Sequence, residues 1–317
     1  MKNGMNKAKT PDLSVDLGFL KLRNPVIAAS GTFGYGLEFK SFIDLNKLGA
    51  ITVKGLYLNP RPGNPPPRLA ESASGLINAI GLQGIGVRAF CDEILPRLEG
   101  LKTPIIINVC GETDEEYAAV IDFLNKVGRI DAYELNISCP NVKKEGRCPA
   151  LSPDHTFSLV KLARQTSRKP VITKLSPNVT DVVSVARAAE EAGSDAISLI
   201  NTLLAMAVDV ETRRPRLANT LGGLSGPAVK PIALRMVYQV ASVVGIPVIG
   251  MGGIMTGRDA LEFLIVGARA VEVGTANLVD PGASLRIVKE IQGYCREKGI
   301  SRVEDIIATL RTDGVHR

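Results

Sequence analysis

Short runs of apolar residues recur along the chain, and longer segments with helical spacing separate them. The runs are rich in Val, Ile and Ala and almost continuously apolar, which is typical of parallel strands buried on both faces. The pattern therefore predicts eight strands, at residues 25–30, 50–55, 104–111, 132–138, 170–176, 196–202, 246–253 and 269–275.

The segments between the strands carry residues that begin and end helices. Ser, Thr and Asp side chains accept hydrogen bonds from the free N–H groups of a first helical turn, and glycine commonly follows the last turn. The predicted starts are Thr113 with Glu116 as a capping box, Ser152 with Pro153, Thr180, and Thr256 with Asp259, and the predicted ends are Gly193 and Gly267.

Eight strands that alternate with helices over about 250 residues predict an α/β fold of the TIM-barrel type, (β/α)8. A doubly wound sheet is the alternative. No linker or low-complexity stretch divides the chain. We therefore expect residues 1–317 to form a single domain, with residues 1–12 frayed at the N-terminus.

Two connections, residues 56–82 and 203–226, exceed the usual loop length. Each follows a predicted strand, and in a barrel such loops lie at the C-terminal face, where active sites are found. We expect both to shape or cover a ligand pocket.

Composition and charge narrow the class of protein. The 317 residues are 45% hydrophobic and 22% charged, which excludes a disordered chain. The net charge is +6, but Lys and Arg are scattered, so a surface that handles anionic ligands is favoured over a nucleic-acid binder. The five cysteines form no CxxC motif, and there is no secretory signal and no membrane-spanning apolar run. We expect a cytoplasmic protein with reduced cysteines and no metal site.

Polar residues and glycines stand at the C-terminal ends of the predicted strands. A barrel would bring these ends together, and two Lys with three Asn among them favour a ligand site over ordinary surface polarity. The strand-end residues are Ser30, Lys54, Gly55, Asn108, Asn136, Lys174, Asn201, Thr202, Gly252, Gly253, Gly274 and Thr275.

The glycines after the last two strands predict a phosphate site. Gly252-Gly253 and Gly274-Thr275 follow strands seven and eight, where barrels commonly bind phosphate, and residues 222–226 precede a predicted helix. The chain has no GxGxxG after an early strand and no GxxxxGK[ST], so neither a Rossmann dinucleotide site nor a P-loop is expected. Tight turns are the alternative interpretation of these glycines.

A mononucleotide cofactor fits such a site, and flavin mononucleotide (FMN) is the candidate. Asn108 and Asn136 can pair with the donor and acceptor edge of an isoalloxazine ring. Lys174 can place positive charge near the pyrimidine end of that ring, where it would stabilise the reduced anionic flavin. The alternative for Lys174 is a salt bridge to an acid such as Glu134.

Cys139 is the candidate reactive thiol, in a Pro-, Gly- and Lys-rich loop just after the fourth strand. Nearby lysines favour thiolate. A metal role is disfavoured because Cys148 is poorly spaced and because His155 and His316 are misplaced, which also weakens a Cys–His nucleophile pair. A general base remains, and an inert loop cysteine is the alternative. Cys91, Cys110 and Cys295 are expected to be packing residues.

These motifs together resemble the dihydroorotate dehydrogenases over nearly the whole chain. The resemblance lies in ELNISCPNV (134–142), Lys54, NPRPGNPPPR (59–68), GLINAIGLQ (75–83), KLSPNV (174–179), INT (200–202) and GGLSGPA (222–228). A cysteine base is similar to class 1 enzymes, since class 2 enzymes use Ser and carry a membrane-binding N-terminal extension, which is expected to be absent here. NAIGLQ with KLSPNV resembles class 1B, which is NAD⁺-linked.

The resemblance implies FMN-dependent oxidation of (S)-dihydroorotate to orotate, with Cys139 as the base. Class 1B also implies a homodimer that joins a partner subunit carrying FAD and a [2Fe–2S] cluster, with electrons passing to NAD⁺. Implied substrate residues are Lys54, Asn78, Ala79, Ile80, Gly81, Leu82, Asn136, Asn201 and Thr202. Implied FMN residues are Ser30, Lys54, Gly55, Asn108, Asn136, Lys174, Ile200, Gly226, Gly252, Gly253, Gly274 and Thr275.

One departure and three alternatives accompany this interpretation. The family usually continues NAIGLQ with Asn-Pro-Gly, where this chain has Gly84-Ile85-Gly86. The alternatives are a fumarate-linked class 1A enzyme, a tRNA-dihydrouridine synthase-like flavoprotein and a non-catalytic flavin-binding scaffold. The second usually carries His-Gly-Arg after a late strand, where this chain has Ile200-Asn201-Thr202, and adds a C-terminal helical domain.

Overall fold

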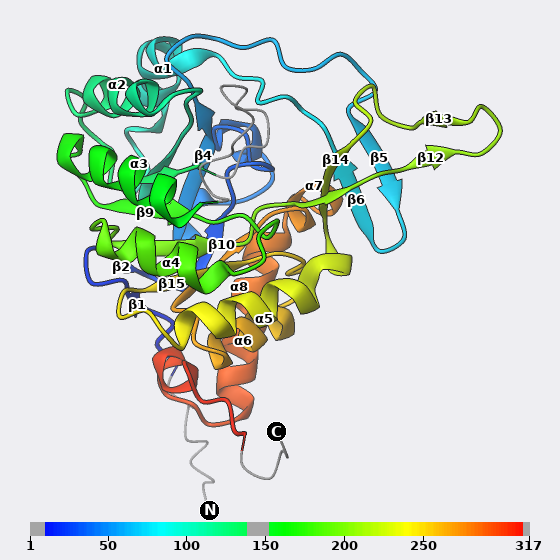
Figure 1. Ribbon diagram of the computed structural model, residues 1–317. Coiled ribbons are helices and arrows are strands. Elements are labelled where there is room, and N and C mark those ends of the chain that lie inside the picture. The colour runs from blue at the N-terminus through cyan, green and yellow to red at the C-terminus, as the bar shows by residue number, and fades with distance from the viewer. Residues whose placement is uncertain (1–9, 138–151, 313–317) are drawn as a thin grey trace, which may run out of the picture.

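Eight parallel strands close into a barrel in the computed structural model, which describes residues 10–137 and 152–312 (Figure 1). The strands follow the chain order around the barrel, so the TIM-barrel prediction is confirmed, and the doubly wound alternative is wrong because the sheet has no edge. The barrel strands are β3 (Val26–Ala28), β4 (Ala50–Leu56), β7 (Ile105–Val109), β8 (Ala132–Leu135), β9 (Val171–Lys174), β10 (Ala196–Leu199), β15 (Val248–Met251) and β16 (Ala270–Val273).

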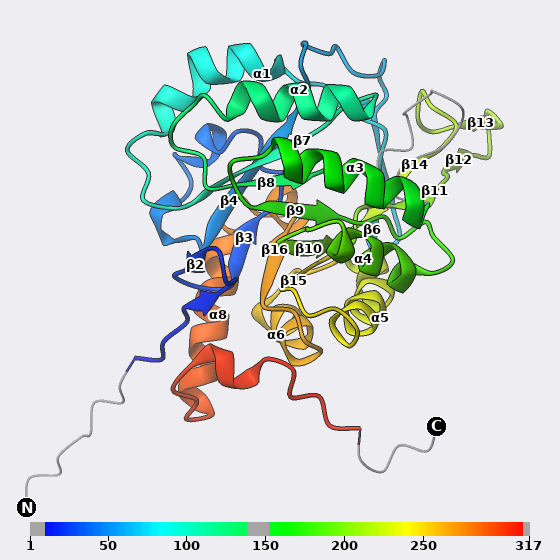
Figure 2. The same cartoon turned by 60° about the vertical axis from the view of Figure 1, so that its left-hand side comes forward.

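Helices surround the barrel on its outer side, as Figures 1 and 2 show from two directions. Their apolar faces pack on the strands, as amphipathic helices do in this architecture. The helices are α1 (Gly86–Ala89), α2 (Asp114–Leu124), α3 (Pro153–Thr166), α4 (Val182–Glu191), α5 (Lys230–Ala241), α6 (Gly257–Ile265), α7 (Ala276–Val279) and α8 (Ala283–Glu297).

Three of the four predicted helix starts are confirmed, while the capping box at Thr113 and the start at Thr180 need correction. Ser152 caps α3, and Thr256 forms a capping box with Asp259 at α6. Thr113 caps α2, but the Glu116 carboxylate accepts from the N–H of Glu112 rather than of Thr113, so the capping box is incomplete.

The predicted start at Thr180 is wrong by one residue. Asp181 is the N-cap of α4, and its side chain accepts from the N–H groups of Val183 and Ser184. A carboxylate also interacts favourably with the helix dipole, which gives Asp181 the advantage over the neighbouring Thr180. The predicted ends are confirmed, since Gly193 and Gly267 have φ of +95° and +118°.

The two overlong connections pair with each other in a small antiparallel sheet. The strand order β11–β14–β6–β5 joins segments that follow different barrel strands, beside the barrel in Figure 1. A second hairpin projects away from this sheet. The sheet strands are β5 (Leu69–Ser72), β6 (Gly75–Asn78), β11 (Leu203–Ala205) and β14 (Gly222–Ser225), and the projecting hairpin is β12 (Val208–Asp209) with β13 (Arg214–Pro215).

The segment around Asp12 is hydrogen-bonded to a segment near the other end of the chain. Strands β1 (Val15–Asp16) and β2 (Lys21–Leu22) form a hairpin. Asp12, inside the segment expected to fray, donates its N–H to Ser301 and accepts from the N–H of Val303. Residues 1–9 lie outside the described residues. No helix in the described ranges is long and apolar enough to cross a membrane.

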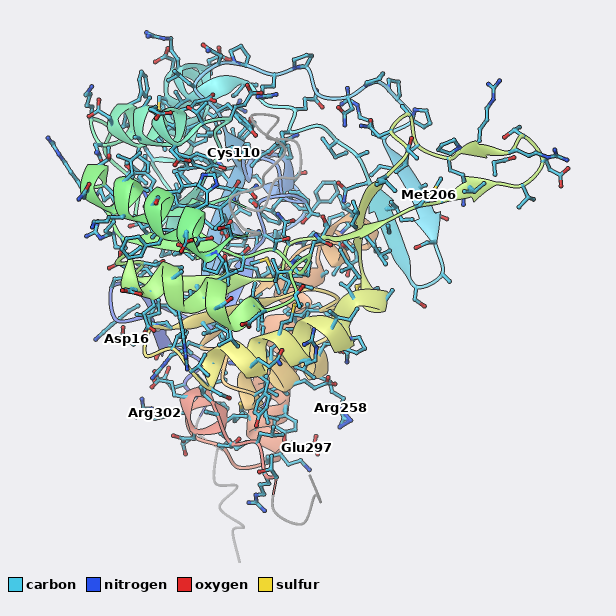
Figure 3. All side chains as sticks on the ribbon, in the orientation of Figure 1. Asp16, Cys110, Met206, Arg258, Glu297 and Arg302 are labelled. Atoms are coloured by element: carbon cyan, nitrogen blue, oxygen red, sulfur yellow. The ribbon has the colours of Figure 1, made fainter. Side chains whose placement is uncertain are left out.

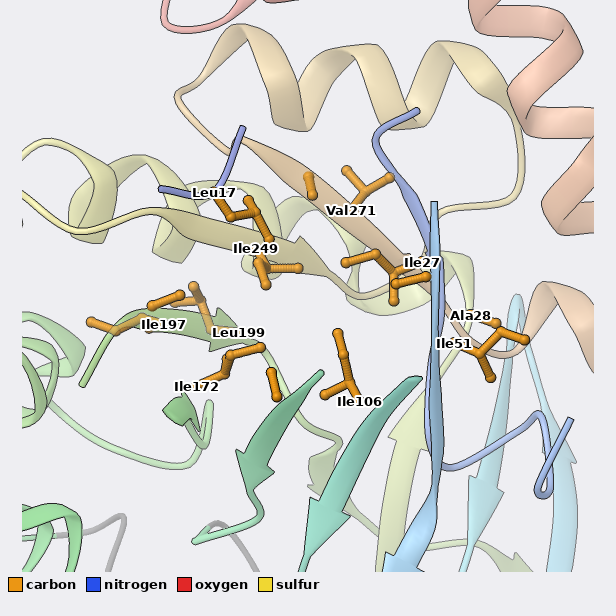
Figure 4. Close-up of a cluster of buried hydrophobic side chains, with 14 of the residues drawn as sticks. Leu17, Ile27, Ala28, Ile51, Ile106, Ile172, Ile197, Leu199, Ile249 and Val271 are labelled. Atoms are coloured by element: carbon orange, nitrogen blue, oxygen red, sulfur yellow. The ribbon is translucent and has the colours of Figure 1, made fainter. Parts of the chain in front are cut away.

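The barrel interior is stacked in layers because side chains along a strand alternate between its two faces. Figure 4 shows Ile27, Ile106, Ile172 and Ile249 gathered within the ring of strands, and all four are completely buried. Residues two positions further along several strands are polar instead. The barrel therefore has an apolar layer beneath a polar one, and the polar layer lies toward the C-terminal face.

Candidate active site

The asparagines predicted at the strand ends form one hydrogen-bonded chain at the mouth of the barrel. Asn136 donates from Nδ2 to Oδ1 of Asn108 over 3.3 Å, and Asn201 donates from Nδ2 to Oδ1 of Asn136 over 3.3 Å. The hydroxyl of Tyr117 donates to the Asn136 backbone carbonyl over 2.7 Å. Three amide side chains from separate strands are thus held in fixed orientations, which suits recognition of a planar ring with amide-like edges.

Lys174 is the buried cation of the site, with only 5% of its surface exposed. Its Nζ lies 3.5 Å from Oε2 of Glu134 and 3.7 Å from Oε2 of Glu272. Burial lowers the pKa of Lys174, but the two carboxylates more than offset this and leave the pKa above its ordinary value. The salt bridge to Glu134, the alternative drawn from the sequence, is present, and it keeps Lys174 charged.

Three glycine turns converge at the C-terminal face of the barrel, after β14, β15 and β16. A Cβ on Gly253, at φ +74°, would lie 2.8 Å from the carbonyl oxygen of Gly226, at φ +91°. The hydroxyl of Thr275 donates to the Ser225 hydroxyl over 2.8 Å. Backbones approach this closely only where side chains are absent, so the turns leave N–H groups accessible to an anion.

Further residues fit a bulky cofactor at the same mouth. A Cβ on Gly252 would lie 3.2 Å from Ile200, and one on Gly55 would lie 2.9 Å from the Asn108 side chain. Among the described residues, the buried hydroxyl of Thr32 has no hydrogen-bond partner, and it stands near Gly274. A free buried hydroxyl beside glycine turns fits a phosphate-bearing ligand that would accept from it.

Lys54 lies inside β4, two residues before its end, and Ser30 lies two residues past the end of the neighbouring strand β3. Ser30 is 5% exposed, and Lys54 is half buried. Burial lowers the pKa of Lys54; Glu38 opposes this shift and Arg68 adds to it. An anionic ligand near Lys54 would oppose the effect of burial, which makes this lysine a suitable partner for a carboxylate.

The segment from Asn78 to Leu82 is fixed on both sides. Asn78 donates from Nδ2 to the Gly223 carbonyl over 3.0 Å, and a Cβ on Gly223 would overlap Thr202. On the other side, Asn64 donates from its N–H to Ile80 and from Nδ2 to Ala79, both over 3.0 Å. The predicted substrate residues on both long connections are therefore adjacent.

Gly84-Ile85-Gly86, where this chain departs from the usual Asn-Pro-Gly, is held by backbone contacts. Gly84 and Arg61 exchange backbone hydrogen bonds of 2.8 and 3.1 Å. Gly86 has φ +82°, and a Cβ there would lie 2.9 Å from the Pro60 nitrogen. These contacts anchor the segment that follows Leu82.

Sequence reasoning missed one acid and two hydroxyls beneath the mouth. Glu272, Thr52 and Ser198 are buried inside the barrel, two or three residues before the predicted strand-end positions. A Glu within the run AVEV was the available signal, because a charged residue is almost never fully buried unless it has a partner.

The cysteines divide into described and undescribed ones. Cys139 and Cys148 lie outside the described residues. Figure 3 marks Cys110, which is buried and donates from Sγ to Asn108 Oδ1 over 3.5 Å. Burial, with a smaller effect of Asp92, raises the pKa of Cys91 to about 11, and burial also raises the pKa of Cys295. The two helix cysteines are therefore thiols at neutral pH, as expected for packing residues.

Fold and site together define a barrel enzyme with an anion-binding C-terminal mouth, of the kind that holds a phosphate-bearing cofactor against a small polar substrate. A family model described as dihydroorotate dehydrogenase matches residues 12–294, and the chain belongs to that family.

Curated relatives extend the match to nearly full length. The chain is 55% identical to "Dihydroorotate dehydrogenase B (NAD(+)), catalytic subunit" of Geobacter metallireducens, over 96% of this chain and 99% of that one. Proteins of the same name match from Geobacter sulfurreducens, at 55% identity over 95% and 98% of the two chains, and Bacteroides thetaiotaomicron, at 51% over 94% and 99%. These matches favour the class 1B interpretation over the alternatives.

A solved structure shows the same fold. The crystal structure titled "Crystal structure of DHODH in complex with ferulenol from Eimeria tenella" superposes with a TM-score of 0.77, covering 98% of this chain and 91% of that one, at 24% sequence identity.

Proposed function

We propose that this chain oxidises (S)-dihydroorotate to orotate in pyrimidine biosynthesis. The observation that carries the proposal is that the C-terminal face of the barrel holds a buried lysine, three linked asparagines and three glycine turns. Cations and amides suit an anionic, amide-rich ring, and the turns suit a phosphate. Near full-length relatives named for this reaction support the assignment.

We assign FMN as the cofactor, which when bound would accept hydride from the substrate. Glycine turns at residues 226, 252–253 and 274–275 would hold its phosphate by backbone N–H groups. Lys174 would stabilise negative charge at the pyrimidine end of the ring. The proposed FMN residues are Ser30, Lys54, Gly55, Asn108, Asn136, Lys174, Ile200, Gly226, Gly252, Gly253, Gly274 and Thr275.

The substrate would lie against the small sheet. Lys54 would pair with its carboxylate, while Asn78 to Leu82, Asn136, Asn201 and Thr202 would bind the pyrimidine edges. Cys139 would remove the proton from C5 as hydride leaves C6. This role for Cys139 rests on the family resemblance.

Anaerobic bleaching of the yellow protein tests the reaction. Adding dihydroorotate without oxygen should bleach the flavin absorbance of the wild-type protein at a saturable rate. Cys139→Ala should retain flavin and bind orotate, but its bleaching should be slower by about 10²–10⁴-fold, because proton removal is no longer assisted.

Cys91→Ala is the matched control, since this thiol sits on a helix and its raised pKa keeps it protonated. It should bleach at the wild-type rate. A wild-type protein that binds FMN and does not bleach with dihydroorotate would contradict the proposed reaction. A Cys139→Ala protein that bleaches at the wild-type rate would exclude Cys139 as the base.

The electron acceptor would be NAD⁺, reached through a partner subunit with FAD and a [2Fe–2S] cluster. The name "catalytic subunit" of the relatives supports a partner. A homodimer within this assembly is part of the proposal. Alternate residues of one extended segment present apolar side chains that are 48–79% exposed, which favours burial in an assembly. These residues are Leu204, Met206, Val208 and Val210.

The proposed location is the cytoplasm, where thiols stay reduced. No disulfide bond joins the three described cysteines, in keeping with such a compartment.

A further inference from the structure

A closed layer of ionisable groups lies directly beneath the mouth of the barrel. Glu134, on β8, is 0% exposed, and Glu272, on β16, is 1% exposed. Lys174, on β9, lies between them, with its Nζ 3.5 and 3.7 Å from the two carboxylates. The layer therefore holds two acids and one base, and the isoleucine side chains gathered within the ring of strands are completely buried as well (Figure 4).

Hydrogen-bond donors distinguish the two acids. Glu134 accepts from Nδ2 of Asn108 over 2.5 Å, from the hydroxyl of Ser198 over 2.9 Å and from Lys174 over 3.5 Å. Three donors satisfy a carboxylate, so Glu134 is suited to carry the negative charge.

Glu272 has fewer donors. Its Oε1 accepts from the hydroxyl of Thr52 over a long 3.3 Å, and within the described residues its Oε2 has no hydrogen-bond partner, although Lys174 is nearby. The charge of Glu134 and a side-chain hydrogen bond with it are among the causes that raise the pKa of Glu272, so the two carboxyls lie next to each other. Two adjacent carboxyls are satisfied when one of them carries a proton and donates it to the other.

Charge balance gives the same result. If both acids were ionised, the layer would carry one uncompensated negative charge in the barrel interior, and unpaired buried charges are strongly destabilising. Burial, and then the charge of Glu134, raise the pKa of Glu272 well above its ordinary value, while Lys174 and Thr52 act in the opposite direction. The balance favours a neutral Glu272.

We propose that Glu134 and Glu272 share one proton in the folded protein, that the proton resides on Oε2 of Glu272 and is donated to Glu134, and that the pair positions Lys174. The layer is then neutral, with Lys174 positive, Glu134 negative and Glu272 uncharged. Glu272 is a positioning residue, since it acts on the cofactor site through Lys174. Its proton prevents the second acid from cancelling the positive charge that Lys174 presents to the mouth.

The proton makes the unfolding equilibrium depend on pH in a defined direction. Between the ordinary pKa of 4.5 for an unfolded Glu and the raised folded value, the native state binds one proton more than the unfolded state. The stabilisation is complete below the unfolded pKa, and it is lost as pH rises through the folded pKa. Within this window the unfolding constant should rise about tenfold per pH unit from this group.

Glu272→Gln is the decisive variant, because its amide keeps both a donor and an acceptor without a titrating proton. Denaturant unfolding of the holoprotein should be measured at several pH values. In this variant, the unfolding constant should lack the tenfold rise per pH unit that the wild type shows. Glu134→Gln should also lose the slope, since the charge that retains the proton is gone. Glu190→Gln is the control, because Glu190 accepts from backbone N–H groups of Gly245 and Ile246, away from the barrel interior, and it should keep the slope.

Infrared difference spectroscopy reads the proton without relying on a variant's stability. Wild-type protein at neutral pH should show the carbonyl stretch of a protonated carboxylic acid, and the band should vanish when pH is raised through the folded pKa. Glu272→Gln should lack the band. A wild-type protein without the band at neutral pH, or Glu272→Gln with an unchanged proton slope, would overturn the proposal.

A third readout concerns positioning and rests on the proposed function. The midpoint potential of bound flavin should fall more steeply with rising pH in wild type than in Glu272→Gln, because ionised Glu272 would weaken the effect of Lys174. Equal pH slopes would remove the positioning role. The unfolding and infrared results need no flavin chemistry, so failure of the proposed reaction would leave them intact.

Discussion

The surroundings of charged residues at the barrel mouth shift the pKa values of these residues. Lys54 and Lys174 illustrate opposite cases. Lys174 lies between two acids, and its pKa is raised, whereas Lys54 is half buried with weaker compensation, and its pKa is lowered. Lys174 thus keeps its charge to higher pH than an ordinary lysine, while Lys54 loses its proton at a lower pH than an ordinary lysine.

Lys54 predicts a pH dependence of substrate affinity. The proton is held below the lowered pKa and lost above it, so the KM for dihydroorotate should rise as pH passes through a value below the 10.5 of a free lysine. Lys54→Arg should move this rise to higher pH, since guanidinium does not deprotonate. Steady-state kinetics with a dye acceptor measures both.

Lys54→Met removes the charge altogether and should raise KM by about 10- to 100-fold, since hydrogen bonds to charged groups contribute about 1.5–3 kcal/mol. Lys126→Met is the control, because Lys126 pairs with Asp122 on the exposed face of α2. A wild-type KM for Lys54→Met would exclude Lys54 from the substrate site.

At the scale of elements, the glycine turns after β15 and β14 depend on each other. The Gly252-Gly253 turn packs against the segment that leads from Gly226 into α5, and both turns have φ values that suit glycine. A side chain at Gly253 or Gly226 would meet backbone atoms rather than a flexible neighbour, so the mouth tolerates little change there.

Gly253→Ala should therefore destabilise the protein by more than about 1 kcal/mol, because its φ of +74° is strained for alanine and its Cβ would meet Gly226 and Lys230 backbone atoms below 3 Å. The variant should also lose flavin during purification, which absorbance ratios measure. Gly293→Ala is the matched control.

Gly293 lies within α8, and a Cβ there would meet nothing within 4 Å. Alanine should stabilise this helix by up to about 1 kcal/mol and leave flavin content unchanged. If Gly253→Ala matched Gly293→Ala in stability and flavin content, the converging turns would have no binding role.

For the whole molecule, the proposed chemistry needs an outlet for electrons. The chain has no dinucleotide fingerprint, and its five cysteines lack iron–sulfur spacing. The relatives named as NAD⁺-linked catalytic subunits therefore favour transfer through another chain.

The isolated chain should reduce artificial dyes at the expense of dihydroorotate but use NAD⁺ poorly. Adding a partner subunit with FAD and a [2Fe–2S] cluster should restore NAD⁺ reduction, measured by NADH absorbance. Partner protein without its cluster is the control. Efficient fumarate turnover by the chain alone, with no effect of a partner, would instead indicate class 1A chemistry.

The barrel could be predicted from the sequence because its strands are buried on both faces, and each is a compact apolar run. The small sheet could not, since the pairing of Gly223 with Asn78 joins residues 145 positions apart and depends on tertiary contacts. Asn108, Asn136 and Lys174 were identifiable by their strand-end positions. The role of Glu272 could not be predicted, because the function of an acid inside a strand depends on which residues lie next to it in the folded protein.

The pairing of β6 with β14 has a mechanical consequence. The strand that leads to Asn78 and the strand beside Thr202 share one hydrogen-bond ladder, so neither can lift without breaking bonds to the other. If the small sheet moved to admit substrate, β6 and β14 would have to move together as one unit. The amide hydrogens of the two strands should exchange with solvent at a common rate, and bound orotate should slow this exchange equally in both strands.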